Sequence, residues 1–473
     1  MPVCPSNHDT AAIPPQHGEP CLPDGERQAS PPSSGLRRLS LKRNFSWTLT
    51  GNVVYSGCQW ATLILIARLG DPETVGRYSL GLAIAAPIIM FANLQLRSVQ
   101  ATDARERFAF ADYLGVRLLT TTLALLIIAG IVLAVPRYHG QVGWIILAVG
   151  LAKAVESISD VYYGLFQQHE RMDRVAISLI LKGPLSLLGL GLCFYLSRDI
   201  LWGALGLAAV WTVLLLGYDV WNGSRILHAL GRRVPRPRWN PRTILPLVRL
   251  TLPLGLVMLG ISLNTNIPRY FIEGYLGERS LGFFAVMISL VTAGTMIVRA
   301  LAQSAMPRLA RHYANGEIGA YRRLLTRLTV IGLLLGGAGI VVMFFAGRPL
   351  LAGLFGAEYA RYSREFIVLM FCAAAMYLTG FFGVAVTAMR RFTIQTVFYG
   401  ANLLVAVLTA AWLIPRYGLL GACWSVTVSA VLLMGCYWVT AYRMDKPAAA
   451  PEQDRWKDHR ENRQDDATED SLV

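Results

Sequence analysis

The sequence predicts an all-α polytopic membrane protein with about twelve transmembrane helices, arranged in two pseudo-symmetric six-helix lobes around a central cavity. Of its 473 residues, 54% are hydrophobic and only 15% are charged, and the mean hydropathy is +0.45. A soluble protein would carry about 25% charged residues. Apolar stretches of about 20 residues recur along most of the chain, and each is long enough to cross ~30 Å of hydrocarbon.

The apolar stretches and the basic residues between them predict the topology. The predicted spans are 46–69, 79–97, 116–135, 144–166, 175–196, 200–221, 250–272, 281–301, 327–346, 366–388, 393–414 and 419–441. Lys and Arg are concentrated in the connections that follow every second span, which predicts that both termini are cytoplasmic. The division is a disordered tail (1–43), a first lobe (44–222), a basic cytoplasmic linker (223–249), a second lobe (250–441) and a disordered charged tail (442–473).

The two halves of the chain share three short motifs in the same order. LGDPETVGRY (69–78) resembles LGERSLGFF (276–284), YYGLFQ (162–167) resembles FFGVAV (381–386), and RDILWGA (198–204) resembles RYGLLGA (416–422). Six spans in each half make the repeat parallel, with its pseudo-twofold axis along the membrane normal, as in many transporters. A duplicated bundle of this kind predicts a cleft between two lobes.

Composition argues against several other classes of protein. Seven scattered cysteines without a CxxC spacing predict neither a disulfide framework nor a zinc site, and no metal or cofactor site is predicted. The net charge of +15 does not indicate nucleic-acid binding, because the basic residues lie at the ends of apolar helices. A membrane glycosyltransferase or polymerase would need catalytic acids in an extracytoplasmic loop. The longest such loop, 347–365, offers only Glu358 and Glu365, so we expect no enzyme.

One predicted span carries three charges. Lys153, Glu156 and Asp160 lie in span 144–166, within an arc of about 60° on one helical face. Each charge at bilayer depth costs roughly 2.5–3.5 kcal/mol on insertion scales. The stripe could be neutralised internally and pack the helix against its lobe. Membrane-embedded ionisable residues usually face a bundle interior or a cavity, so we favour a stripe that lines a water-filled cleft.

Other polar residues are candidates for the same cleft. Lys182 lies beside Gly183 and Pro184 at a predicted kink, and four arginines end spans one, two, seven and eight: Arg68, Arg97, Arg269 and Arg299. The alternative for each cation is anchoring at the headgroup level. Taken together they predict cations on both lobes. The polar candidates are Asn52, Tyr55 and Gln59, which share one face of the first span, and Asn93, which the repeat places opposite Arg299. Their alternative role is hydrogen bonding between helices.

Several of these segments resemble a known transporter family over roughly residues 40–441. The segments are ARLGDPETVGRYSLGLAIAAPII (67–89), ANLQLRSVQATDA (92–104) and YYGLFQ (162–167), in a chain of twelve predicted spans in two related halves. They resemble the polysaccharide transporter branch, of the O-antigen flippase type, in the multidrug/oligosaccharidyl-lipid/polysaccharide exporter superfamily. Lipid II flippases of that superfamily have fourteen spans. Its multidrug exporters have twelve, so a multidrug exporter is the alternative.

The resemblance implies a flippase of the bacterial cytoplasmic (inner) membrane. Such a protein moves polyprenyl-diphosphate-linked oligosaccharides from the inner to the outer leaflet, and its partners are that substrate, membrane lipid and the polysaccharide polymerase or export machinery. Arg and Lys suit the diphosphate. Cationic drugs would favour a cavity with excess acid, whereas the predicted cavity has more base. Glu156 and Asp160 are either salt-bridge partners of Lys153 or groups that couple transport to an ion gradient.

Overall fold

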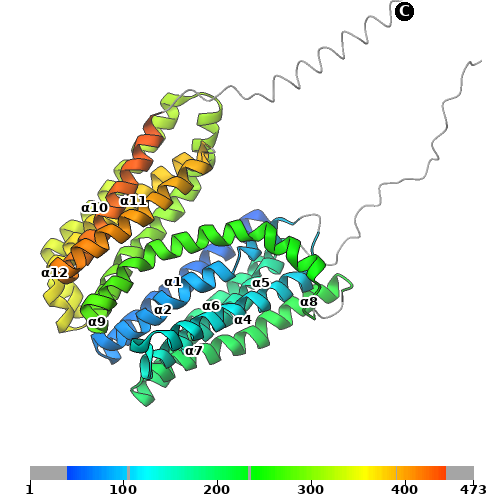
Figure 1. Cartoon of the computed structure of the whole chain (residues 1–473). Helices are drawn as coiled ribbons and strands as arrows, with labels where there is room; N and C mark the ends of the chain where they lie inside the picture. Colours follow the sequence, from blue (N-terminus) through cyan, green and yellow to red (C-terminus); the bar gives the residue numbers. More distant parts are fainter. Residues whose placement is uncertain (1–39, 104–106, 233–235, 390, 444–473) are drawn as a thin grey trace, which may run out of the picture.

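The computed structural model describes residues 40–443 except 104–106, 233–235 and 390, and every regular element in this part of the chain is helical. The predicted terminal tails lie almost entirely outside the described residues. Two helical bundles meet near the middle of α9 and diverge from there toward the ends that lead to the chain termini (Figure 1). The arrangement is that of a polytopic membrane protein with two lobes.

The first bundle consists of α1 to α8. Its elements are α1 (Leu41–Leu69), α2 (Pro72–Ala92), α3 (Leu96–Thr102), α4 (Phe110–Ala134), η1 (Pro136–Tyr138), α5 (Gln141–Gln168), α6 (Met172–Ser197), α7 (Ile200–Leu214), the π-helical turn η2 (Leu215–Val220) and α8 (Trp221–Ala229). Local sequence explains the α1–α2 turn: an Asp71 carboxylate oxygen accepts the Thr74 N–H at 2.8 Å, and Pro72 occupies the first helical position.

The second bundle is built from longer helices. It comprises α10 (Ile318–Phe355), η3 (Ala357–Tyr362), α11 (Ser363–Ala388), α12 (Phe392–Tyr442) and the second segment of α9 (Pro241–Ala314). α9 and α12 each contain one non-helical residue, Gly277 (φ 78°) and Gly418 (φ 59°). Glycine tolerates this left-handed backbone because it has no Cβ. Each break separates two predicted spans.

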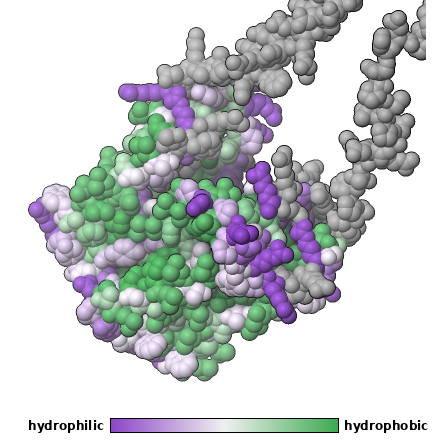
Figure 2. Space-filling model, turned by 45° about the vertical axis from the view of Figure 1, so that its right-hand side comes forward, coloured by the Kyte–Doolittle hydropathy of each residue, from purple (hydrophilic) through white to green (hydrophobic). Residues whose placement is uncertain are grey.

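The described helices present a hydrophobic outer surface. Figure 2 shows a broad hydrophobic band across the bundles, with hydrophilic side chains gathered toward its edges. Nine helices in the described ranges are long and apolar enough to cross a membrane. α1 is not among the nine, whereas α9 and α12 each cover two predicted spans. The fold class is confirmed, and the count of twelve stays a prediction.

The predicted span 79–97 lies within one candidate membrane span, Pro72–Thr102, but its helix is interrupted. α2 ends at Ala92, and Leu94 and Gln95 adopt left-handed φ values of 48° and 52° before α3 begins. Such values are uncommon for residues other than glycine and are found where the surrounding structure holds them. No Gly or Pro marks this break, so hydrophobic periodicity alone does not predict it.

The first pair of repeated motifs forms a close contact between α2 and α9. A Cβ atom added at Gly76 would lie 1.8 Å from the Glu278 carbonyl oxygen, and one added at Gly282 would lie 1.7 Å from the Pro72 carbonyl oxygen. Gly76 and Gly282 differ by 206 in number, as do Pro72 and Glu278. Equivalent residues of the two halves therefore contact one another reciprocally, as a pseudo-twofold axis requires.

Alanine at either of these glycines should destabilise the protein. The added methyl group must push two helix backbones apart, and overpacking of this kind costs about 1–3 kcal/mol. We expect Gly76→Ala and Gly282→Ala to lower the thermal unfolding temperature in detergent. Gly337→Ala in α10 is the matched control, because no atom lies within 4 Å of a Cβ there. Equal stability of all three variants would contradict a tight crossing.

Candidate functional site

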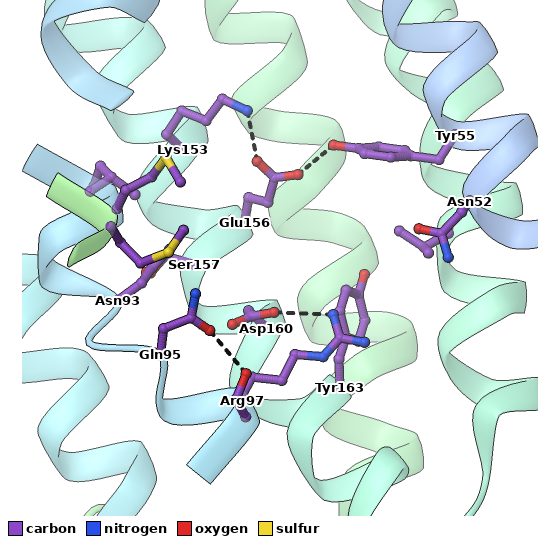
Figure 3. Close-up of a pocket in the computed structure, with 15 residues that line it drawn as sticks. Asn52, Tyr55, Asn93, Gln95, Arg97, Lys153, Glu156, Ser157, Asp160 and Tyr163 are labelled. Carbon is purple, nitrogen blue, oxygen red and sulfur yellow. Dashed lines mark hydrogen bonds and ion pairs between the residues drawn. The ribbon is translucent and has the colours of Figure 1, made fainter. Parts of the chain in front are cut away.

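A polar cavity of about 500 Å³ opens in the first bundle, on the side that faces α9. Figure 3 shows side chains of α1, α2, α3, α5 and α6 around it. Its lining residues are Asn52, Tyr55, Ile89, Met90, Asn93, Gln95, Arg97, Ser98, Lys153, Glu156, Ser157, Asp160, Tyr163, Leu179 and Met258. Only Met258 comes from α9. The broken segment between α2 and α3 therefore forms part of the cavity wall.

The charged stripe predicted on α5 lies on this wall, and its charges are paired. The Lys153 ammonium lies 2.8 Å from one Glu156 carboxylate oxygen, and the Tyr55 hydroxyl donates to the other oxygen (Figure 3). The Lys153 and Glu156 side chains are 28% and 26% exposed. The stripe is therefore charge-neutralised, and it also lines a cavity. Whether this cavity acts as a water-filled cleft in transport stays a prediction.

Asp160 lies between two arginines. One carboxylate oxygen lies 3.3 Å from the Arg97 guanidinium on α3, and the other lies 3.3 Å from the Arg117 guanidinium on α4. Arg97 is 31% exposed, whereas Arg117 is fully buried. Arg117 also donates to the Asn93 side-chain oxygen, and to the Ser157 hydroxyl at 3.2 Å. We call Arg97 and Lys153 the wall cations.

Lys182 does not line the cavity, in contrast to the prediction. Its side chain is fully buried in α6, and its ammonium lies 5.3 Å from the ring centroid of Trp211 and 5.4 Å from that of Tyr163. Within the described part of the chain the ammonium has no hydrogen-bond partner. The turn of α6 that holds Lys182 packs inside the bundle, so Lys182 lies one layer behind the wall. We call Arg117 and Lys182 the buried cations.

Two charged members of this cluster are not among the candidates from the sequence. Arg117 lies near the start of predicted span 116–135, and Asp219 lies near the end of predicted span 200–221. Asp219 is fully buried in η2, where one carboxylate oxygen accepts a hydrogen bond from Ser178 at 2.8 Å. Both are ionisable residues inside apolar segments, which is the signal that could have identified them.

The remaining candidates lie elsewhere. Gln59 lines a neighbouring cavity of about 220 Å³, which it shares with Lys153. Arg68 reaches the second bundle and donates to the carbonyl oxygens of Gly353 and of Leu354, the latter at 2.8 Å. Arg269 donates to the Asn266 side chain within α9, at 3.1 Å. Arg299 is exposed on the second segment of α9.

The charge of the lining therefore differs from the expected excess of base on both lobes. Among the lining residues, the two wall cations face two carboxylates, and all four groups belong to the first bundle. The buried charged residues of the first bundle are also balanced, because Arg117 and Lys182 are matched in number by the carboxylates of Asp112 and Asp219. The physical reason is local pairing, since an unpaired charge at this depth is costly.

Two helical bundles, the first with a polar, charge-paired cavity, have the architecture of a multi-pass membrane transporter. The chain belongs to the family described as "Polysaccharide biosynthesis protein", whose model matches residues 41–312 and so spans the first bundle and nearly all of α9. A Staphylococcus aureus relative, "Capsular polysaccharide biosynthesis protein CapF", is 27% identical over 400 residues, which cover 84% of this chain and 98% of that protein. The family resemblance seen in the sequence is confirmed.

Solved structures show the same fold. An inward-facing multidrug resistance MATE family transporter of the MOP superfamily matches with a TM-score of 0.65 at 13% identity, covering 83% of this chain and 97% of that one. The lipid II flippase MurJ in an inward closed conformation matches with a TM-score of 0.62 at 10% identity, covering 84% and 87%. Both share the two-bundle helical fold of this chain.

Proposed function

We propose that this protein is a flippase that moves a polyprenyl-diphosphate-linked oligosaccharide from the inner to the outer leaflet of the bacterial cytoplasmic membrane, for cell-surface polysaccharide biosynthesis. The observation that carries the proposal is the pair of wall cations in the cavity of a protein of the polysaccharide biosynthesis family. A diphosphate carries about two negative charges and cannot cross hydrocarbon unpaired. Transport, and no chemical conversion, is the proposed activity.

The wall cations suit phosphate oxygens in complementary ways. Arg97 offers a planar guanidinium with several fixed donors, and Lys153 offers a mobile point charge. Asn52, Asn93 and Gln95 bring amide groups that suit sugar hydroxyls to the same cavity. Its volume of about 500 Å³ is in the usual range for small-molecule sites, ~300–1,000 Å³. The diphosphate and adjoining sugars would enter this cavity while the lipid tail stays in the bilayer.

Alternating access is proposed from contacts that gather where the bundles meet. Arg77 of α2 lies 2.7 Å from Glu278 of α9, and Arg137 lies 3.3 Å from Glu273. The bundles diverge toward the opposite end (Figure 1). The basic connections between predicted spans suggest that the diverging end is cytoplasmic. The conformation would then load substrate from the inside, and release would require these contacts to break.

A translocation assay in proteoliposomes tests the proposal. A lipid-linked oligosaccharide incorporated into liposomes should become accessible to an impermeant glycan-modifying reagent faster with the protein than without it. Loss of the protein in cells should trap the same lipid in the inner leaflet and leave resistance to cationic drugs unchanged. Drug efflux without translocation would support the multidrug alternative. A new glycosidic product would instead indicate an enzyme.

Glu156→Gln separates the two proposed roles of the cavity carboxylates. Glu156 accepts hydrogen bonds from both Lys153 and Tyr55, so we expect it to act as a counterion. A neutral amide keeps the shape of the side chain but cannot exchange a proton. We therefore expect the ratio of translocation rates with and without an imposed proton gradient to match that of wild type. A ratio that falls to one would support the coupling role, and Asp160→Asn is the parallel measurement.

A further inference from the structure

We propose that Lys182 and Arg117 are positioning residues that hold Glu156 and Asp160 while the wall cations transfer to the phosphates of the substrate. This inference rests on the proposed function. It assigns the buried cations a part in binding although neither of them lines the cavity.

Asp160 lies between a wall cation and a buried cation, and Glu156 contacts a wall cation and has a buried cation in the layer behind it. Asp160 has Arg97 on the cavity side and Arg117 on the buried side, with both guanidinium groups at 3.3 Å. Glu156 has Lys153 at 2.8 Å on the cavity side, and it interacts electrostatically with buried Lys182. Both ammonium groups lie 5.3 Å from the ring centroid of Trp211. Both carboxylates of α5 therefore have a cation on each side, in direct contact at Asp160 and, for Lys182, one Trp211 ring away from the Lys153–Glu156 pair.

A phosphate that takes over a wall cation completely must displace the carboxylate that already contacts it, Glu156 at Lys153 or Asp160 at Arg97. If Lys153 left Glu156 with no other cation, a partly buried carboxylate would keep only its hydrogen bond from Tyr55, and separating partly buried charge pairs is unfavourable. A second cation behind the carboxylate removes most of this penalty. The exchange then replaces one carboxylate by one phosphate at each wall cation, and reversal of the exchange releases the substrate.

The buried cations are fixed in place and have unused donors. Arg117 donates to Asn93 and Ser157, and its Nε hydrogen has no acceptor among the described residues. Lys182 lies against Tyr163 and Trp211, and the same part of the chain offers its ammonium no acceptor. Unsatisfied donors at buried positions are rare in proteins. Here they would be filled when Glu156 and Asp160 lose their wall partners, which accounts for their presence before substrate binds.

The two units also suggest why a diphosphate suits the site. Glu156 and Asp160 are four residues apart on α5, which is about 6 Å along the helix axis. Each unit releases one cation toward the same cavity. A ligand with two adjacent phosphoryl groups can engage both wall cations, whereas a monophosphate engages one. We therefore expect inorganic pyrophosphate to bind more tightly than inorganic phosphate.

The competing explanation is that Lys182 serves only Asp219. That carboxylate is also buried, and Lys182 is its cationic neighbour. Tyr162 and Tyr163 on α5 and Tyr218 in η2 are the other titratable groups near it. If neutralising Asp219 were the sole role of Lys182, removing Lys182 would destabilise the bundle without a specific effect on anion binding. The experiment must therefore separate Glu156 from Asp219.

The test measures pyrophosphate binding to the purified full-length protein by titration calorimetry. Lys182→Met should weaken binding at least 10-fold. The double variant Lys182→Met/Glu156→Gln should bind pyrophosphate within about 3-fold of the single variant Glu156→Gln. The neutral amide at position 156 needs no second cation to compensate its charge. Adding Asp219→Asn or Asp160→Asn to Lys182→Met instead should not restore the affinity. Lys182→Arg, which keeps the charge, should bind as wild type does. Arg117→Met with Asp160→Asn is the equivalent pair for the second unit.

Several outcomes of this experiment would contradict the proposed role of the buried cations. Restoration by Asp219→Asn in place of Glu156→Gln would overturn the inference. If Lys182→Met does not fold, the comparison of Glu156→Gln with Lys182→Met/Glu156→Gln remains, and a 10-fold loss between these two would also overturn it. If Lys153→Ala and Arg97→Ala leave pyrophosphate binding and translocation unchanged, the proposed function itself fails. A third outcome is that the alanine variants bind pyrophosphate more weakly but Glu156→Gln does not rescue Lys182→Met. This outcome would support the proposed function and contradict the role of the buried cations.

Discussion

Alanine at Arg97 and Lys153 together should reduce the translocation of lipid-linked oligosaccharide at least 100-fold, and each single change should reduce it about 10-fold or more. Hydrogen bonds to charged groups contribute about 1.5–3 kcal/mol, and 1.4 kcal/mol corresponds to a factor of ten. Both side chains are partly exposed at the cavity wall, so their loss removes the donors that would meet the diphosphate. The initial rate in proteoliposomes, normalised to the amount of inserted protein, is the measurement.

Arg299→Ala is the matched control for these variants. Arg299 is also an arginine in a predicted span, but it is exposed on α9 and does not line the cavity. Its replacement should leave the rate within about twofold of wild type. If Arg299→Ala reduced the rate as strongly as Arg97→Ala, the substrate path would have to include the second bundle.

Linking the two bundles at their contact should stop translocation almost completely. We expect a short, cleavable, thiol-reactive cross-linker between Arg77→Cys and Glu278→Cys to block transport, and cleavage to restore it. The Arg77 and Glu278 side chains form an ion pair across the bundles, at 2.7 Å, so the introduced thiols lie within reach of such a reagent. The variant should be made in a background in which the native cysteines are replaced.

A cross-link inside the second bundle is the control for this experiment. Arg279 and Glu358 form an ion pair at 3.0 Å, and both belong to the second bundle. Linking Arg279→Cys to Glu358→Cys by the same reagent should leave transport unchanged. Transport that continued with the Arg77 and Glu278 positions linked would contradict a mechanism in which the bundles separate there.

The sequence predicts the general architecture well, because apolar length and helical periodicity are local properties. The stripe of Lys153, Glu156 and Asp160 follows directly from a period of 3.6 residues, and the structure places all three on the cavity wall. The repeated motifs also identify segments that meet, since Gly76 and Gly282 pack at equivalent points. These features need only the order of residues along one helix or between two similar ones.

The composition of the site was less accessible from sequence, because it depends on which helices are neighbours. Lys182 and Lys153 look alike in sequence, yet one is enclosed by aromatic rings and the other faces the cavity. Arg117 reaches Asp160 only because α4 packs against α5. The turn at Leu94 and Gln95 has no glycine or proline, so tertiary packing and not local preference sets its backbone.

The ionisable groups around the cavity all belong to α1–α8, and this has an evolutionary consequence. The repeated motifs indicate that the two halves arose by duplication, and under the proposed function only the first half recognises the cargo. Selection for a new glycan would then act on the charged residues of the first half, while the second half is constrained mainly by packing and movement. Divergence between relatives that carry different glycans should accordingly be uneven along the chain.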